Sequence, residues 1–140
     1  MLQAGPDESR VVDDTGAIIT GLPRRLYTTH YTTPGVILEV KDPQSRAILE
    51  EALSTGRLQV LDPAPEYVEK AKTIAGQAGV LPRLSRTDIE VLALALQLAL
   101  ESGRGKTYLA TDDLRLQEAA EKAGLKVIPI RYRRRGRRRS

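Results

Sequence analysis

Four acidic positions stand where apolar runs meet the ends of expected helices and strands. They are Asp14 after the stretch RVVD, Glu39 within PGVILEVKD, Asp88 at the start of a long apolar segment, and Asp113 after TYLAT, with Asp112 beside it. Carboxylates that are brought together repel one another, and their pKa values rise unless a cation compensates. Hard oxygen ligands without His or Cys select Mg²⁺ or Mn²⁺ over zinc. This pattern predicts a divalent-metal site suited to metal-assisted phosphodiester hydrolysis.

Each acid also has a purely structural explanation. Asp is common in turns after strands, a Glu on a short helix faces solvent by default, and Asp88 stands at a capping-box position. Asp112 and Asp113 could cap the next helix, although one cap needs only one acid. Taken together, the four positions favour the metal site. We expect the hydroxyl groups of Thr15 and Thr111 to orient its carboxylates, with a β-branched strand end as an equal alternative.

Arginines lie both near these acids and at the end of the sequence. Arg83, Arg86 and Arg115 are expected to guide phosphates towards the acidic edge, with solvated surface charge as the alternative. The last ten residues add seven candidate RNA-binding residues, namely Arg131, Arg133, Arg134, Arg135, Arg137, Arg138 and Arg139. Without these seven, 15 basic residues stand against 18 acidic ones. The tail is therefore expected to be disordered when free and to bind polyphosphate in a salt-sensitive way, unless it is only solvated.

The composition restricts the other kinds of chemistry. At 140 residues, the chain is expected to form one domain. It has no cysteine, which excludes disulfides, Cys-type zinc sites and thiol catalysis, and the single His30 argues against a catalytic triad or a multi-His metal site. The apolar run at 89–100 is too short to span a bilayer, and the polar N-terminus argues against a signal peptide. We therefore expect a cytoplasmic protein without a membrane partner.

Strands and helices are expected to alternate along the chain. Strands are predicted at 10–14, 26–29, 57–61, 107–111 and 126–130, with helices starting at Pro34 and spanning 44–54, 66–77 and 114–124, and a buried helix after Ser85. The segment 17–21 is expected to be a helical or irregular connection that stops at Pro23. This alternation implies an α/β fold with a parallel sheet, in which ligands bind at the carboxyl ends of the strands.

At these acids the sequence resembles the PIN-domain nucleases. VVDDTGAI is similar to the first strand of that family and its Asp-Thr/Ser step, which selects Asp14 over Asp13. PGVILEVKD is similar to the helix that carries the second acid, Glu39, and the T-x-D step in ATDD selects Asp113. Within that family, LSRTDIEVLALAL and TDDLRLQEAAEKAGLKV resemble the Nob family, which trims the 3′ end of small-subunit ribosomal RNA in archaea and eukaryotes. The resemblance spans nearly the whole chain and is most specific at 84–127, where Gln117 also matches.

This resemblance implies a three-layer α/β/α PIN-like fold with a central parallel sheet, formed by residues 1–130 and followed by the Arg-rich tail at 131–140. It implies a Mg²⁺- or Mn²⁺-dependent endoribonuclease that cleaves single-stranded RNA in small-subunit ribosomal RNA 3′-end maturation. Asp14, Glu39, Asp88 and Asp113 would be catalytic metal ligands, with Asp112 as an additional ligand.

One departure leaves the physiological substrate open. Nob proteins usually continue into a Cys-rich zinc ribbon, and this sequence has no cysteine and has Glu118 where an Asn often follows the Gln. A VapC-like toxin ribonuclease with an antitoxin, and a non-catalytic RNA-binding ribosome-assembly factor, therefore stay open as alternatives. Pre-ribosomal RNA is the expected partner, and a homo-oligomer or a ribosome-assembly protein is a further partner to consider.

Overall fold

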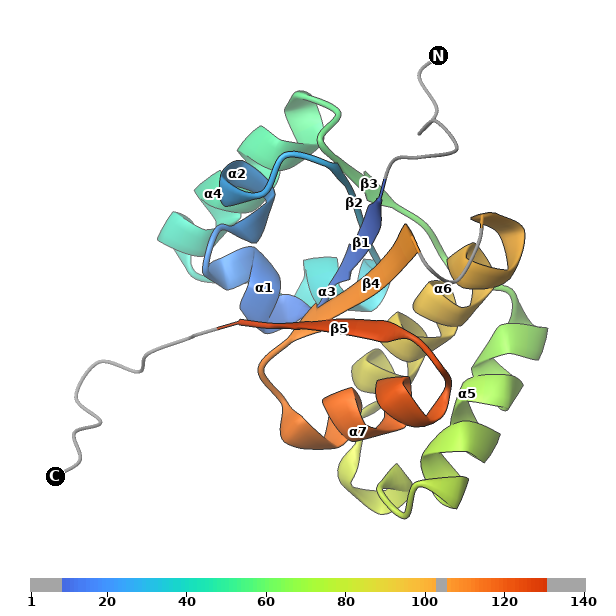
Figure 1. Cartoon of the computed structure of the whole chain (residues 1–140). Coiled ribbons are helices and arrows are strands. Elements are labelled where there is room, and N and C mark those ends of the chain that lie inside the picture. Colours follow the sequence, from blue (N-terminus) through green and yellow to red (C-terminus); the bar gives the residue numbers. More distant parts are fainter. Residues whose placement is uncertain (1–8, 103–105, 131–140) are drawn as a thin grey trace, which may run out of the picture.

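The computed structural model describes residues 9–102 and 106–130. Five strands in this part of the chain form one parallel sheet in the order β3-β2-β1-β4-β5 (Figure 1). Their bounds are β1 (Arg10–Asp13), β2 (Thr29–Thr32), β3 (Leu58–Val60), β4 (Thr107–Thr111) and β5 (Lys126–Pro129). The order reverses beside β1, so the carboxyl ends of β1 and β4 lie next to each other at the switch point where α/β sheets bind ligands.

Helices cover both faces of this sheet and make the fold a three-layer α/β/α sandwich, as expected (Figure 1). Helices α5, α6 and α7 lie on one side, and α1, α2 and α4 lie on the other. The helices are α1 (Thr15–Ile19), α2 (Leu22–Arg25), α3 (Pro34–Glu39), α4 (Pro43–Ser54), α5 (Pro65–Gln77), α6 (Arg86–Ser102) and α7 (Leu114–Lys122), with a 3-10 turn η1 (Leu81–Arg83) before α6.

Helix α6 is the centre of the larger core. Its sequence is apolar nearly all round, and Val91, Leu92 and Leu94 are buried. The helix contacts β1, β4, α5 and α7, so its side chains are covered from more than one side. A smaller apolar cluster, which includes Val11 and Ala110, fills the opposite face of the sheet. Packing on both sides holds the central strands, and with them the residues that follow those strands. Across the described ranges, no helix is both long and apolar enough to cross a membrane.

The connection between β1 and β2 differs from the expectation. Segment 26–29 was expected to be a strand, but β2 begins only at Thr29 because two short helices precede it. Gly21 has φ 78°, which lets the chain turn sharply between α1 and α2. Pro23 lies in the first turn of α2, where its missing N–H costs nothing, so it does not end the segment. Tyr27 consequently lies outside the sheet and is 78% exposed.

Candidate functional site

Two adjacent strands deliver acidic residues to the carboxyl edge of the sheet. Asp14 directly follows β1, and its N–H donates to the carbonyl of Ala110 on β4 at 3.2 Å. Asp112 and Asp113 directly follow β4. A Cβ atom built on Gly16 would lie 3.5 Å from Oδ1 of Asp14 and 3.5 Å from Oδ1 of Asp112, so both carboxylates converge on the start of α1. Residues almost a hundred positions apart thus form one acidic edge.

Asp88 reaches the same edge from helix α6. It forms the expected capping box, because its N–H donates to Ser85 Oγ at 3.0 Å and its Oδ2 accepts from the Ser85 N–H at 2.9 Å. Burial raises the pKa of Asp88, the hydrogen bonds with Ser85 oppose this, and the charges of Asp113 and Glu39 raise it further. Carboxylates from α6, α3 and the start of α7 are therefore close enough to repel one another.

Two threonine hydroxyls connect the acids. Thr15 Oγ1 donates to Glu39 Oε1 at 2.7 Å, which ties the start of α1 to the end of α3. Thr111 Oγ1 accepts from the N–H of Asp113 at 3.0 Å, and its side chain also hydrogen-bonds Asp14. Gln117 Nε2 donates to the Thr111 carbonyl at 2.8 Å and fixes the turn that carries Asp113. These bonds set carboxylate positions, while a role for the two threonines in catalysis stays a prediction.

Asp14 is the most strongly perturbed acid of this edge. Burial raises its pKa to about 6, although hydrogen bonds from Thr111 and from the N–H of Ala17 favour the charged form. The charges of Asp112 and Asp13 add to the increase. Salt bridges between described residues do not include Asp14. The ionised form is therefore poorly stabilised by the chain itself, and a cation from outside would favour it.

The donor chemistry fits a hard divalent cation, but the carboxylates do not form a ready ligand set. Within the described part of the chain, no three His, Cys, Asp or Glu side chains are grouped so that they could hold a metal ion. Helix capping uses some of the carboxylate oxygens, because Asp14 accepts from the N–H of Ala17, and Asp113 Oδ1 accepts from the N–H groups of Arg115 and Leu116. Asp88 is committed to its capping box. Metal ligation requires oxygens that these caps leave unused, or a change of carboxylate rotamer.

The residue before Asp14 has a different environment. Asp13 Oδ2 lies 2.7 Å from His30 Nδ1, and His30 Nε2 lies 2.8 Å from the carbonyl of Leu26. Both side chains of the Asp13–His30 pair are fully buried. Burial lowers the pKa of His30, but the hydrogen bond and charge of Asp13 raise it more, so the net shift is upward. The sequence did not predict this pair; a single histidine within a β-branched run was the available signal.

The predicted phosphate-guiding arginines lie on the surface. Arg83, Arg86 and Arg115 are all exposed. Arg86 Nε lies 3.3 Å from Glu90 Oε2, so the charge of Arg86 is partly compensated by an ion pair within α6. Arg115 follows Asp113 in the first turn of α7. The seven arginines predicted at 131–139 lie outside the described residues, so their role stays a prediction.

Comparisons with known proteins show similarity to ribonucleases. The family model described as the PIN domain of ribonuclease matches residues 11–98. Ribonuclease VapC3 of Aeropyrum pernix is 49% identical over 123 residues, which are 88% of this chain and 87% of that protein. Endoribonuclease Nob1 of Pyrococcus abyssi is 36% identical over 122 residues, 87% of this chain and 69% of that protein. The 20S-pre-rRNA D-site endonuclease nob1 of Schizosaccharomyces pombe is 37% identical over 99 residues, 69% of this chain and 25% of that protein.

Proposed function

This chain belongs to the PIN-domain family of ribonucleases, and from this premise we propose that it is a divalent-metal-dependent endoribonuclease that hydrolyses single-stranded RNA. One observation carries the proposal. Acids from β1, α3, α6 and the β4–α7 turn meet at the carboxyl edge of the sheet, where Asp14 is buried and the pKa of Asp88 is raised partly by Asp113 and Glu39. Such mutual repulsion is a cost to the fold that a bound cation would relieve.

In this proposal, Asp14, Glu39, Asp88 and Asp113 hold Mg²⁺ or Mn²⁺, with Asp112 as an additional ligand. PIN-domain nucleases generally use divalent metal ions, and hard carboxylate oxygens suit both candidates. When bound, the metal supplies an activated water and neutralises charge on the scissile phosphate. The chain itself holds the carboxylates: Thr15 orients Glu39, and Thr111 connects Asp14 to the backbone of Asp113.

The leading substrate is small-subunit pre-ribosomal RNA, processed at its 3′ end. The similarity to Nob1 proteins of an archaeon and a yeast supports this assignment, and the name of the yeast protein refers to pre-rRNA. The second candidate is a toxin ribonuclease, because the similarity to VapC3 has the higher identity and covers most of both chains. Growth arrest on expression, together with a small protein that co-purifies and blocks cleavage, would favour the toxin. The third candidate is a non-catalytic RNA-binding assembly factor.

Metal titration separates the nuclease from the binding factor. Mn²⁺ is titrated calorimetrically into the purified chain and into Asp113→Asn. We expect saturable binding heat in the wild type and much weaker binding in the variant, because a carboxylate ligand is lost while Asn still caps α7. Cleavage of an end-labelled single-stranded RNA should require Mn²⁺ or Mg²⁺ and should stop on addition of EDTA. Binding heat that is absent from both proteins would overturn the metal-dependent mechanism.

A further inference from the structure

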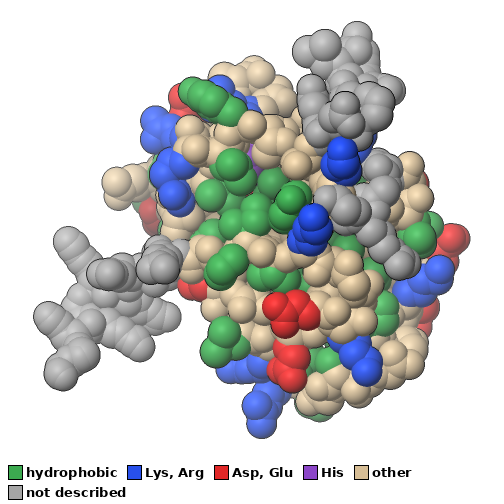
Figure 2. Space-filling model, in the orientation of Figure 1, with side chains coloured by type: hydrophobic (Ala, Val, Ile, Leu, Met, Phe, Trp, Pro, Cys, Tyr) green, Lys and Arg blue, Asp and Glu red, His purple; other side chains and the backbone are tan. Residues whose placement is uncertain are grey.

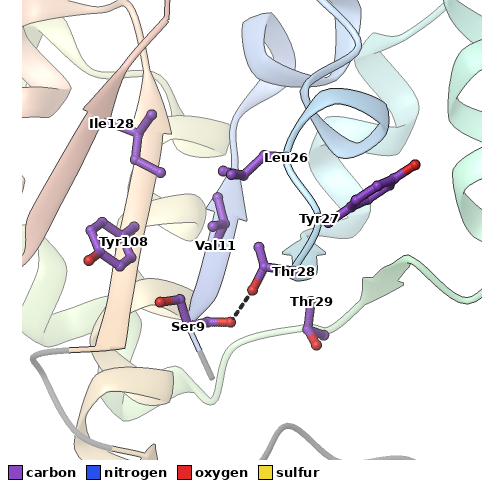
Figure 3. Close-up of a pocket in the computed structure, with 8 residues that line it drawn as sticks. All are labelled: Ser9, Val11, Leu26, Tyr27, Thr28, Thr29, Tyr108 and Ile128. Atoms are coloured by element: carbon purple, nitrogen blue, oxygen red, sulfur yellow. Dashed lines mark hydrogen bonds between the residues drawn. The ribbon is translucent and has the colours of Figure 1, made fainter. Parts of the chain in front are cut away.

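A hollow of about 540 Å³ lies on one face of the sheet, away from the acidic edge. Its apolar floor consists of Val11 on β1, Ile128 on β5 and Leu26 after α2 (Figure 3). Tyr108 on β4 lies beside Ile128, and Tyr27 lies on the opposite side of the hollow. The described residues that line it include no Asp or Glu. This composition contrasts with the carboxylates at the other end of the same strands.

Cations accompany both tyrosines of the hollow. The chain has five tyrosines and no phenylalanine or tryptophan, and two of the five line this one hollow. The Arg57 guanidinium lies 4.6 Å from the centroid of the Tyr27 ring, and Lys126 Nζ lies 5.6 Å from that of Tyr108. Figure 2 shows apolar side chains gathered on this face, with Lys and Arg side chains at its margins. The hollow therefore has an apolar floor with hydroxyl-bearing side chains around it, and a cation lies against each of its two tyrosines.

This chemistry fits single-stranded RNA. Exposed aromatic rings stack on unpaired bases, and cations beside them contact the phosphates. Hydroxyl groups suit the ribose 2′-OH, which is both a donor and an acceptor. Thr28 Oγ1 already donates to the Ser9 carbonyl, while Thr29 places a further hydroxyl at the rim. The described lining residues carry no carboxylate that would repel a polyanion.

The edge of the sheet beside the hollow is poorly suited to a second copy of the chain. Strand β5 is the edge strand, and it is only four residues long. It carries the exposed residues Lys126 and Pro129, and Lys and Pro at a sheet edge oppose strand-to-strand pairing. Charge complementarity therefore favours a polyanion over a second subunit.

Strand β4 connects the hollow to the acidic edge. Tyr108 lines the hollow, and Asp112 follows the same strand four residues later, which is roughly 13 Å at the usual rise of a strand. We propose that the hollow binds a nucleotide of the single-stranded RNA substrate at a distance from the cleaved phosphate, an inference that rests on the proposed function. Tyr27 stacks on its base, and Arg57 and Lys126 contact its phosphates.

RNA binding by full-length variants tests this site. Fluorescence anisotropy with a labelled 12-nucleotide oligouridine is measured in EDTA, so that no cleavage occurs. Tyr27→Ala should weaken binding about five- to tenfold, because a stacking surface is lost. Lys126→Gln should weaken binding about threefold and reduce the salt dependence of log K by about 0.7, the value for one phosphate contact on a single strand. The seven tail arginines are present in every variant, so they do not affect the comparison.

Lys70→Gln is the matched control. Lys70 Nζ lies 5.4 Å from the centroid of the Tyr67 ring on α5, the same kind of pair as Lys126 with Tyr108, but far from the hollow. Its RNA affinity and salt dependence should equal those of the wild type. If Tyr27→Ala and Lys126→Gln also bind RNA as the wild type does, the proposal is wrong. Unchanged RNA affinity with a dimer-to-monomer change in sedimentation velocity would instead identify a subunit interface and overturn it.

Cleavage assays keep this inference separate from the proposed function. With Mn²⁺ present, Tyr27→Ala and Lys126→Gln should raise KM for RNA and leave kcat within about twofold, because the hollow does not touch the reacting phosphate. A fall in kcat with KM unchanged would contradict a binding role. A wild-type chain that binds RNA through Tyr27 and Lys126 but never cleaves would refute the nuclease and leave the binding site intact.

Discussion

Asp13 and Asp14 are neighbours in the sequence and both are buried, yet the fold treats them differently. Asp13 Oδ2 lies 2.7 Å from His30 Nδ1, so Asp13 has a partner within the chain, although burial still raises its pKa. Asp14 caps α1 beside Asp112, and the described residues provide it with no salt bridge. Burial alone does not distinguish a structural acid from a functional one. The two acids differ instead in their counter-charge, which Asp13 finds in His30 and which no described residue gives to Asp14.

The largest effect is expected from Asp14→Asn. Asn caps helices as well as Asp does, so α1 and the overall fold should remain intact. The loss of a charged ligand should lower kcat/KM for RNA cleavage on the order of a thousandfold, read as lost stabilisation of the transition state. Single-turnover cleavage with circular dichroism as the control for folding measures this. If the Asp14→Asn variant cleaves RNA at the rate of the wild type, other residues carry out the chemistry.

The structural half of the comparison is tested by His30→Leu. This change leaves Asp13 as a buried acid without its partner, so the free energy of unfolding should fall by about 3–5 kcal/mol. Adding Asp13→Leu removes the unpaired group and should recover part of the loss. Urea denaturation of the single and double variants measures both values. If the single variant is as stable as the wild type, the buried pair does not hold β1 to β2.

The raised pKa of Asp14 gives a smaller and pH-dependent effect. Its folded pKa of about 6 exceeds the ordinary value of 3.8, so the folded chain binds the proton more tightly than the unfolded chain does. Ionised Asp14 therefore lowers stability above pH 6, and this penalty disappears as the pH falls towards 4. In EDTA at pH 7.5, Asp14→Asn should be more stable than the wild type by about 1–3 kcal/mol. Thermal unfolding of the wild type and the variant at pH 4 and at pH 7.5 checks this. An Asn variant that is less stable than the wild type at pH 7.5 would contradict it.

The smallest effect is expected at the threonine that contacts Glu39. Thr15→Ala removes the 2.7 Å hydrogen bond to Glu39 Oε1 and should lower kcat/KM about three- to tenfold, since one hydrogen bond contributes about 1 kcal/mol. Thr15→Ser keeps the hydroxyl group and should stay near wild-type activity. Equal losses in the two variants would mean that the methyl group matters, and the hydroxyl would then have no positioning role.

Much of the architecture follows from local sequence signals. The helices at 34–39, 43–54, 65–77 and 114–122 and the strands at 107–111 and 126–129 match the expected segments, because caps and hydrophobic periodicity are properties of neighbouring residues. The capping box at Ser85 and Asp88 is confirmed for the same reason.

The contacts that were not predicted depend on the pairing of distant strands. Val11 pairs with His30 across β1 and β2, and this register brings Asp13 to the imidazole. The two short helices before β2 delay that strand, so it begins later than its local sequence predicts. The hollow also joins residues from β1, β4, β5 and the α2–β2 connection. The pattern of neighbouring residues in the sequence carries no information about which distant strands bring their side chains together.

The order of the strands has a consequence for the timing of synthesis. Asp13 pairs with Ala110 across β1 and β4, so the acidic edge is built from residues near both ends of the chain. During translation, strands β1, β2 and β3 leave the ribosome well before β4 can join them. The nascent chain therefore lacks Asp112 and Asp113 until most of the domain has been made, and it carries only part of the edge. In a chain of this topology, the acidic edge is therefore completed only late in synthesis.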